Sequence, residues 1–362
     1  MPLKEVGRPV FFPPRCTNTA CAMHHDPKSD FYSREGFYQP KCRAHPVPRF
    51  RCRACGRGFS RQTFRADYRD HRPGLNTRLF HLLCSGVGLR QSSRLLGLSR
   101  RSTELKFRKI ARHLRRLNLN LRGPLPPSSQ LQFDELETYE GRRNTRPLSL
   151  PILIERKSRY VIWAESAPIR PHGRMSEARR RAIVEDERRY GPRKDLSRRS
   201  VRRTLERGAE LAADLRPVEL HTDEKSTYPV LAKAAFGAGR LLHSCTNSQV
   251  ARMTWNPLFA INHTEAMARD LLGRLRRRSW LASKLRRYLD LGMQVWMTYR
   301  NYVRKRFNFD GESPAQKLGF VDRRMTPTEV LSWRQDWGAC SVHPLGRNGV
   351  SVGAWARLRA AA

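Results

Sequence analysis

The chain has 362 residues, and its 71 lysines and arginines against 32 acidic residues give a formal net charge of +39. The length excludes a one-motif mini-protein and suggests two or three domains. The charge is far larger than solubility requires, which indicates a polyanionic partner. Nucleic acid fits best, because each Lys or Arg that neutralises a phosphate releases counterions, and Arg adds bidentate hydrogen bonds. The alternative is a ribosome-associated or merely basic protein.

No window of the sequence approaches the ~18 consecutive apolar residues of a membrane helix. The N-terminal stretch MPLKEVGRPVFFPP also lacks the apolar core of a signal peptide. We therefore expect a cytoplasmic protein whose partner is double-stranded DNA and not a membrane. The eight cysteines agree with this, because closely spaced Cys pairs in a reducing compartment indicate metal binding and not disulfides.

Residues 1–65 predict a zinc-ribbon-like module. They are rich in Cys, Pro, Gly and His, which indicates a loop-dominated segment with too few apolar residues to order without a metal. Zinc needs four tetrahedral thiolate or imidazole ligands, and two close pairs supply them: Cys16, Cys21, Cys52 and Cys55. Four other residues are near enough to replace a member of the first pair: His24, His25, Cys42 and His45. The alternative is a disordered arm with unliganded cysteines.

Residues 66–122 predict a helix-turn-helix DNA-binding domain. A short helix over 89–96 and a turn over 97–99 precede a longer helix that reaches about residue 117, with Ser99 as its N-cap. One face of the longer helix is apolar and consists of Phe107, Ile110, Ala111, Leu114 and Leu117. The other face is expected to contact DNA and carries Arg101, Ser102, Lys109, Arg112 and Arg116. The alternative is an amphipathic helix with a solvated basic face.

Residues 128–305, which follow a Pro-rich linker, predict an α/β domain. Strand-like runs occur at LQFDELETYE, LSLPILIERKSRYVIWAES, PVELHTDE and RLLHSC. We expect a basic helical insertion near 170–216 and one long helix from about 262 to about 304. Three aromatic residues of that helix should pack in the core: Trp296, Tyr299 and Tyr302. For the tail over 306–362 the sequence predicts no role.

Two aspartates follow apolar runs, so we expect Asp134 and Asp223 at or near strand ends. Phosphodiester cleavage by two metal ions needs carboxylates that converge on one point, and strand ends supply such convergence. Glu135 should point to the other side of its strand.

The predicted long helix offers a third ligand at Asn262 or Glu265, one turn apart. Arg269 and Arg276 share that face, which places cations beside the metals where a DNA backbone would pass.

The order of these features resembles that of compact bacterial insertion-sequence transposases of the DDE class. The resemblance spans roughly Cys16 to Asn301 and is most specific in RCRACGRGF, FDELETY and residues 262–284. It implies an RNase H-like catalytic domain that cuts and joins the ends of the element with Mg²⁺ or Mn²⁺. The family's first Asp falls on Asp134 and its second on Asp223.

The third position departs from the family. An ungapped alignment places the family's Glu on Asn262 and a following basic residue on Arg269, whereas related families place Glu three residues after an Asn, which matches Glu265. Asn can coordinate a hard cation through its carbonyl oxygen, but it brings no charge.

The sequence therefore predicts an α/β, RNase H-like catalytic domain, preceded by a zinc ribbon and a helix-turn-helix domain, in a transposase that acts as a homo-oligomer on DNA ends. The rival hypothesis is a non-catalytic DNA-binding regulator, or a domesticated transposase that still binds DNA.

Overall fold

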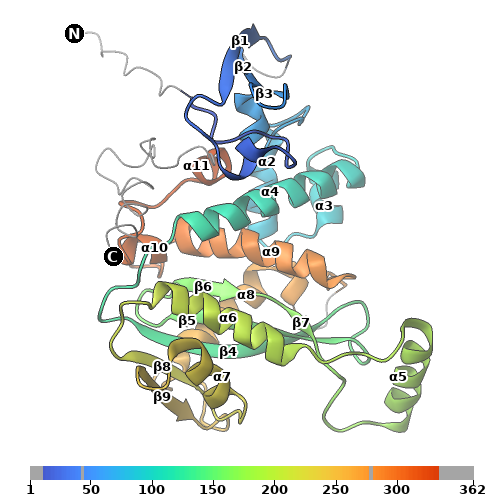
Figure 1. Ribbon diagram of the computed structural model, residues 1–362. Coiled ribbons are helices and arrows are strands. Elements are labelled where there is room, and N and C mark those ends of the chain that lie inside the picture. The colour runs from blue at the N-terminus through green and yellow to red at the C-terminus, as the bar shows by residue number, and fades with distance from the viewer. Residues whose placement is uncertain (1–10, 42–44, 277–279, 334–362) are drawn as a thin grey trace. The chain divides into compact units, whose positions relative to one another are not determined.

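The computed structural model describes residues 11–41, 45–276 and 280–333 (Figure 1). The chain divides into two compact units, Met1–Asn76 with Leu331–Ala362 and Thr77–Val330. In the described ranges, no helix is both long enough and apolar enough to cross a lipid bilayer.

The first unit contains a three-stranded antiparallel sheet with strand order β1-β2-β3. Its elements are α1 (Ala22–His25), β1 (Tyr32–Tyr38), β2 (Val47–Cys52), β3 (Gly58–Ser60) and the 3-10 helix η1 (Arg61–Phe64). Five phenylalanines form a buried cluster with the cysteines: Phe11, Phe31, Phe50, Phe59 and Phe64. The expectation of a loop-dominated segment without a core is therefore wrong, because rings far apart in the sequence converge on one side of the sheet.

The second unit begins with the helices α2 (Leu75–Cys84, which starts in the first unit), α3 (Leu89–Leu95) and α4 (Arg100–Asn120). The predicted short helix, turn and longer helix are present as α3, residues 96–99 and α4. The side chain of Ser99 caps α4 by accepting a hydrogen bond from the backbone amide of Ser102 (3.1 Å). All five residues of the predicted apolar face of α4 are buried. The helix runs three residues beyond the predicted end.

The apolar face of α4 packs on α9 (Arg286–Thr298) as well as on α3. The rings of Phe107 and Tyr288 stack with centroids 6.4 Å apart, and Asn118 Nδ2 donates to the carbonyl oxygen of Gln294 (3.1 Å). These contacts tie α4 into the same compact unit as the sheet. The predicted division between residues 122 and 128 therefore has no counterpart in the two units.

A mixed sheet lies at the centre of the second unit, with strand order β6-β5-β4-β8-β9 and β7 paired to β5. The strands are β4 (Gln130–Tyr139), β5 (Pro147–Glu155), β6 (Val161–Ala164), β7 (Ala167–Pro168), β8 (Val218–Asp223) and β9 (Leu241–Thr246). The first three strands are antiparallel, whereas β8 is parallel to β4 and β9 is parallel to β8. Five of these strands match the predicted runs to within one residue, and the short β7 lies just beyond the second run. The α/β class is confirmed.

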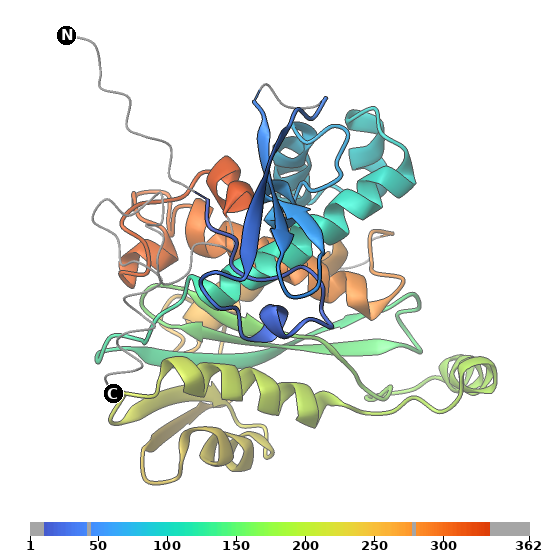
Figure 2. The ribbon, with the colours of Figure 1, turned by 45° about the horizontal axis from the view of Figure 1, so that its top comes forward.

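Helices cover both faces of this sheet (Figures 1 and 2). The helices α6 (Ser197–Leu211) and α7 (Tyr228–Phe236) lie on one face, and α8 (Phe259–Leu271) lies on the other. The prediction of an insertion over 170–216 is thus wrong for α6, whose buried residues pack on β5 and β6. Within residues 170–216, α5 (Glu177–Tyr190) is the helix that projects beyond the sheet.

The prediction of a single long helix over 262–304 is also wrong. Helix α8 ends at Leu271, and Leu272 has an extended backbone (φ −107°, ψ 106°). A Cβ atom on Gly273 would lie 2.4 Å from the carbonyl oxygen of Gly86, so this glycine permits a close approach of two backbones. The chain then forms the 3-10 helix η2 (Gly273–Leu275), α9, the π-helix η3 (Tyr299–Val303), α10 (Pro314–Lys317) and α11 (Pro327–Ser332). Trp296 and Tyr302 are fully buried, as predicted, and Tyr299 is half-buried.

Candidate functional site

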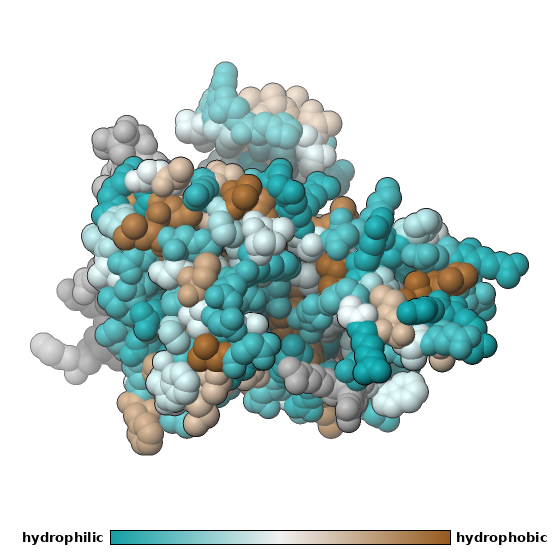
Figure 3. Space-filling model, turned by 90° about the horizontal axis from the view of Figure 1, so that it is seen from below, coloured by the Kyte–Doolittle hydropathy of each residue, from teal (hydrophilic) through white to brown (hydrophobic). Residues whose placement is uncertain are grey.

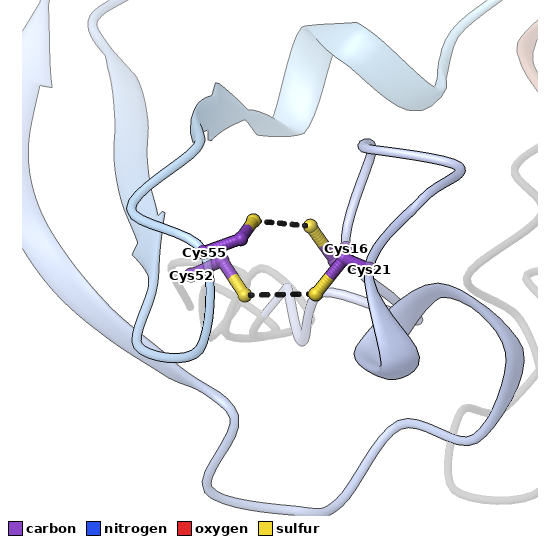
Figure 4. Close-up of side chains that lie close together, drawn as sticks. All are labelled: Cys16, Cys21, Cys52 and Cys55. Atoms are coloured by element: carbon purple, nitrogen blue, oxygen red, sulfur yellow. Dashed lines mark hydrogen bonds between the residues drawn. The ribbon is translucent and has the colours of Figure 1, made fainter.

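Four cysteines converge at the first unit's sheet (Figure 4). Their sulfur atoms all lie within 4.8 Å of one another. Cys16 Sγ is 3.5 Å from Cys55 Sγ, and Cys21 Sγ is 3.9 Å from Cys52 Sγ. Zinc–sulfur bonds of about 2.3 Å in a tetrahedron place the sulfurs about 3.8 Å apart. The group can therefore hold a metal ion and is compatible with structural zinc.

The alternative ligands lie elsewhere. His24 Nδ1 and His25 Nε2 are hydrogen-bonded to the carbonyl oxygens of Cys16 (2.8 Å) and Thr19 (3.0 Å). His45 is exposed, and the fourth candidate, Cys42, lies outside the described residues. Burial raises the pKa of the Cys16 thiol to about 12, so without a cation this sulfur is protonated.

Asp134 and Asp223 are carried by neighbouring parallel strands. Gln132 of β4 pairs with His221 of β8, and each aspartate lies two residues further along its strand. The expectation that Asp134 lies near a strand end is wrong, because β4 continues to Tyr139. It lies instead where the pairing with β8 ends, and Asp223 is the last residue of β8.

Gln132 fixes α8 against this part of β4. Its fully buried side chain donates from Nε2 to the carbonyl oxygen of Pro257 (2.6 Å), and its Oε1 accepts from the backbone amide of Ile261 (3.0 Å). Side chains two residues apart on a strand share a face, so Asp134 faces α8 as Gln132 does.

A cavity of about 290 Å³ is bordered by all four predicted acidic-site residues, Asp134, Asp223, Asn262 and Glu265. It is also bordered by Arg252 and Arg269. Glu265 is buried, and Asn262 is half-buried. Desolvation by burial raises the pKa of Asp134 to about 6; the negative charge of Asp223 adds to this effect, whereas the Glu135 amide and Arg252 oppose it.

The carboxylates do not gather as tightly as the thiolates. Among the described residues, only the cysteines bring three or more ligand atoms within 4.8 Å of one another. A site that holds two metal ions about 4 Å apart does not require ligand atoms this close together. Two ligand atoms that bind the ions from opposite ends of such a site lie on the order of 8 Å apart.

Glu135 also borders this cavity, but its carboxylate contacts side chains on the face of the sheet opposite α8, as predicted. Its carboxylate accepts hydrogen bonds from Tyr228 Oη (2.8 Å) and Ser149 Oγ (2.5 Å), and it forms an ion pair with Lys225. These partners come from α7, β5 and the loop after β8. Glu135 therefore joins the sheet to the helical layer on the opposite face.

Further cavities extend from the acidic one and are lined by arginines. One of about 560 Å³ is bordered by Arg252, Asn262, Glu265, Arg269 and Arg276. Another of about 440 Å³ shares Arg269 and Arg276 with it and adds Arg143 and Arg179. Arg276 lies beyond the end of α8 and still reaches the same surface as Arg269. The face drawn in Figure 3 is mostly hydrophilic, with hydrophobic side chains in scattered spots.

The predicted DNA-contacting residues of α4 lie mostly at the surface. Arg101, Ser102, Arg112 and Arg116 are exposed, whereas Lys109 is half-buried. Ser102 takes part in the N-cap, since its hydroxyl oxygen accepts from Ser99 Oγ (2.9 Å).

Sequence reasoning missed Gln132 and Arg252. A signal for Gln132 existed, because it lies two residues before Asp134 and so shares its face of the strand. No motif marked Arg252. Comparison of the chain with protein-family models and with curated proteins gave no match.

Proposed function

We propose that the second unit is an RNase H-like catalytic core that cuts and joins DNA at the ends of an insertion element, as DDE transposases do. The observation that carries this proposal is the cavity bordered by Asp134, Asp223, Asn262 and Glu265. The strand order supports it as well, because three antiparallel strands followed by two parallel ones place Asp134 and Asp223 on adjacent strands.

The side chains at the cavity suit a hard cation, since carboxylate and amide oxygens are the ligands that Mg²⁺ and Mn²⁺ prefer. When bound, such ions supply charge stabilisation at the scissile phosphate. Asp134 and Asp223 would hold them, with Glu265 or Asn262 as the third ligand. The raised pKa of Asp134 fits this role, because a buried carboxylate beside another is most stable with a cation between them.

The arginines beside the cavity would bind the DNA backbone. Guanidinium groups match phosphate oxygens in geometry and charge, and Arg252, Arg269 and Arg276 border the cavities next to the carboxylates. A strand held there would pass the acidic side chains with its phosphates oriented for cleavage.

The remaining parts of the proposal concern assembly and anchoring. The exposed basic face of α4, with Arg101, Arg112 and Arg116, would contact double-stranded DNA, and zinc would hold the cysteine module. A homo-oligomer would bring the two DNA ends of the element together. A bacterial protein associated with the nucleoid would meet its DNA substrate in the nucleoid.

The test is cleavage and strand transfer of DNA that carries the gene with its flanking sequence, in Mg²⁺ or Mn²⁺. Asp134→Ala and Asp223→Ala should each lose activity by at least a hundredfold and keep DNA affinity within about twofold, because they remove metal ligands and no phosphate contact. Glu224→Ala is the matched control, since Glu224 is exposed, adjoins Asp223 and does not border the cavity.

Two further variants identify the third ligand. If Glu265→Ala is inactive and Asn262→Ala is active, Glu265 is the third metal ligand. If Asn262→Ala is inactive and Glu265→Ala is active, the ligand is Asn262. If Asp134→Ala and Asp223→Ala cut DNA like the parent, the catalytic proposal fails and the DNA-binding regulator takes its place.

A further inference from the structure

A second group of cations lies beside the first turn of α8, separate from the acidic cavity. Arg159 lies in the turn between β5 and β6, and its Cζ is 5.6 Å from the ring centroid of Phe259 and 5.7 Å from that of Phe307. The His263 ring is 5.9 Å and 6.2 Å from the same two centroids. Phe259 and His263 are one turn apart, so they share a face of α8, next to the face that carries Asn262.

Arg300 brings a buried charge to this group. It belongs to the π-helix η3, its side chain is 0% exposed, and its Nε, Nη1 and Nη2 have no hydrogen-bond partner in the described part of the chain. Arg159 Nη1 is also buried, and it too has no hydrogen-bond partner in the described part of the chain. A buried charged group without a partner destabilises a fold. A bound anion would offset the positive charge of these arginines and so reduce this cost.

The carboxylates near these arginines are engaged elsewhere. Asp310 forms its ion pair with Arg306. The carboxylate of Glu155 accepts hydrogen bonds from the Ser158 amide and hydroxyl (both 2.6 Å) and from the Lys157 amide (3.1 Å). Neither acid forms a hydrogen bond with Arg159 or Arg300, and Glu155 acts on Arg159 only through its charge, which partly opposes the lowering of the arginine's pKa.

Both arginines remain charged at neutral pH. Burial, followed by the charges of neighbouring arginines, lowers the pKa of Arg159 and that of Arg300 to about 10 in each case. Those neighbours include Arg304 and Arg306, which follow η3. Repulsion among like charges adds to the advantage of binding an anion here.

The backbone at Arg159 supports a functional role. Its φ of 63° lies in the left-handed region, which side chains other than glycine rarely adopt, and its amide donates to the carbonyl oxygen of Glu155 (3.0 Å). Strained positions of this kind cluster at ligand-binding and active sites.

We propose that Arg159, Arg300 and Arg304 form a binding site for a phosphate group. The half-buried Arg159 and Arg304 would contact the anion, and the fully buried Arg300 would supply charge behind them. The rings of Phe259 and Phe307 keep one side of Arg159 dry, which strengthens its attraction for the anion. Phosphate binding stands on these contacts alone, whereas its assignment to a DNA backbone phosphate rests on the proposed function.

The experiment measures the melting temperature of the zinc-loaded full chain, without Mg²⁺, in chloride and in inorganic phosphate at equal ionic strength. Phosphate should raise the melting temperature of the parent, and Arg159→Gln and Arg300→Met should lose more than half of this rise. Arg199→Gln is the control and should keep it, because Arg199 is an exposed cation of α6 in the same unit and is not one of the arginines that act on Arg159 or Arg300. Calorimetry should show phosphate affinity reduced at least tenfold in Arg159→Gln.

Arg300→Met adds a readout that a purely structural arginine would not give. In phosphate-free buffer this variant should melt no lower than the parent, because methionine fills similar volume without an unpaired charge. An equal phosphate-induced rise in the parent, Arg159→Gln and Arg300→Met would overturn the site, and Arg159→Gln decides the question if Arg300→Met does not fold.

A short DNA duplex then identifies the source of the phosphate. Competition between the duplex and inorganic phosphate in the parent, and its loss in Arg159→Gln, would assign the site to the DNA backbone; no competition would contradict that assignment and leave free phosphate as the ligand. A protein that binds phosphate at these arginines but cuts no DNA would contradict the proposed function alone.

Discussion

The position of Asp134 would favour metal binding but lowers the stability of the metal-free fold at neutral pH. Its half-buried carboxyl lies on the side of the strand that faces α8, and desolvation together with the charge of Asp223 raises its pKa to about 6. In the unfolded chain the pKa of an aspartate is about 3.9. The folded metal-free protein therefore favours the protonated form of Asp134.

This shift predicts a pH-dependent stability. A carboxyl whose pKa is raised by folding contributes stability that is present below about pH 4 and is lost as the pH rises through about 6, a loss of roughly 2–3 kcal/mol. Without Mg²⁺, Asp134→Asn should therefore have a higher free energy of unfolding than the parent at pH 7.5, and the difference should vanish near pH 4. Urea unfolding at several pH values measures it.

The exposed Glu224→Gln is the control and should follow the parent at every pH. A difference between Asp134→Asn and the parent that stays constant from pH 4 to pH 7.5 would contradict the assigned pKa.

The sequence predicted which residues border the cavity better than it predicted their positions along the elements. Asp134 was recognisable because it follows an apolar run, yet its place in the middle of β4 depends on where β8 stops pairing, which is a tertiary property. Arg252 lies in a loop with no regular pattern, so only the folded chain shows that it faces Asp134.

Among the elements, the helices departed from expectation more than the strands did. Runs of Val, Ile and Leu mark the strands, and the Ser99 cap marks the start of α4. The composition of α6 is dominated by arginine, which hides its buried stripe of Val201, Leu205 and Leu211. The break after Leu271 depends on the close packing of Gly273 against Gly86, a contact between distant residues that periodicity cannot show.

The place of α6 in the layer predicts the effect of a single methyl group. A Cβ at Gly208 would lie 2.3 Å from Leu153 Cδ2, and Leu153 is fully buried in β5, so Gly208→Ala should destabilise the protein by about 1–3 kcal/mol. Gly292→Ala in α9 is the control. Its nearest neighbour would be Arg274 Cδ at 3.4 Å, so the gain in helix propensity should leave stability unchanged or raised by up to about 1 kcal/mol.

Chemical denaturation of both variants checks this pair. If Gly208→Ala is as stable as Gly292→Ala, then α6 is not packed on β5 and the original interpretation as an insertion would stand.

At the scale of the whole molecule, the chain combines two units that are stabilised in different ways. The second unit buries a six-stranded sheet between helices, which suffices for an independent core. The first unit has a three-stranded sheet and an aromatic cluster that shares its interior with the cysteines. Small cores of this kind usually need a metal or a disulfide for stability.

Removal of zinc should therefore affect one unit and spare the other. A chelator should speed amide hydrogen exchange in β2 and β3, where Phe50 and Phe59 pack beside the thiols, and leave exchange in β4 and β5 unchanged. Cys55→Ser should lose the metal without a chelator. Cys245→Ser is the matched control, because Cys245 is equally an exposed cysteine but lies outside the cluster, so this variant should keep one zinc ion per chain. Elemental analysis and exchange mass spectrometry measure the two effects.

Faster exchange in β4 and β5 on chelation would show that the second unit depends on the metal. Unchanged exchange in β2 and β3 would show that the aromatic cluster orders the first unit without the metal.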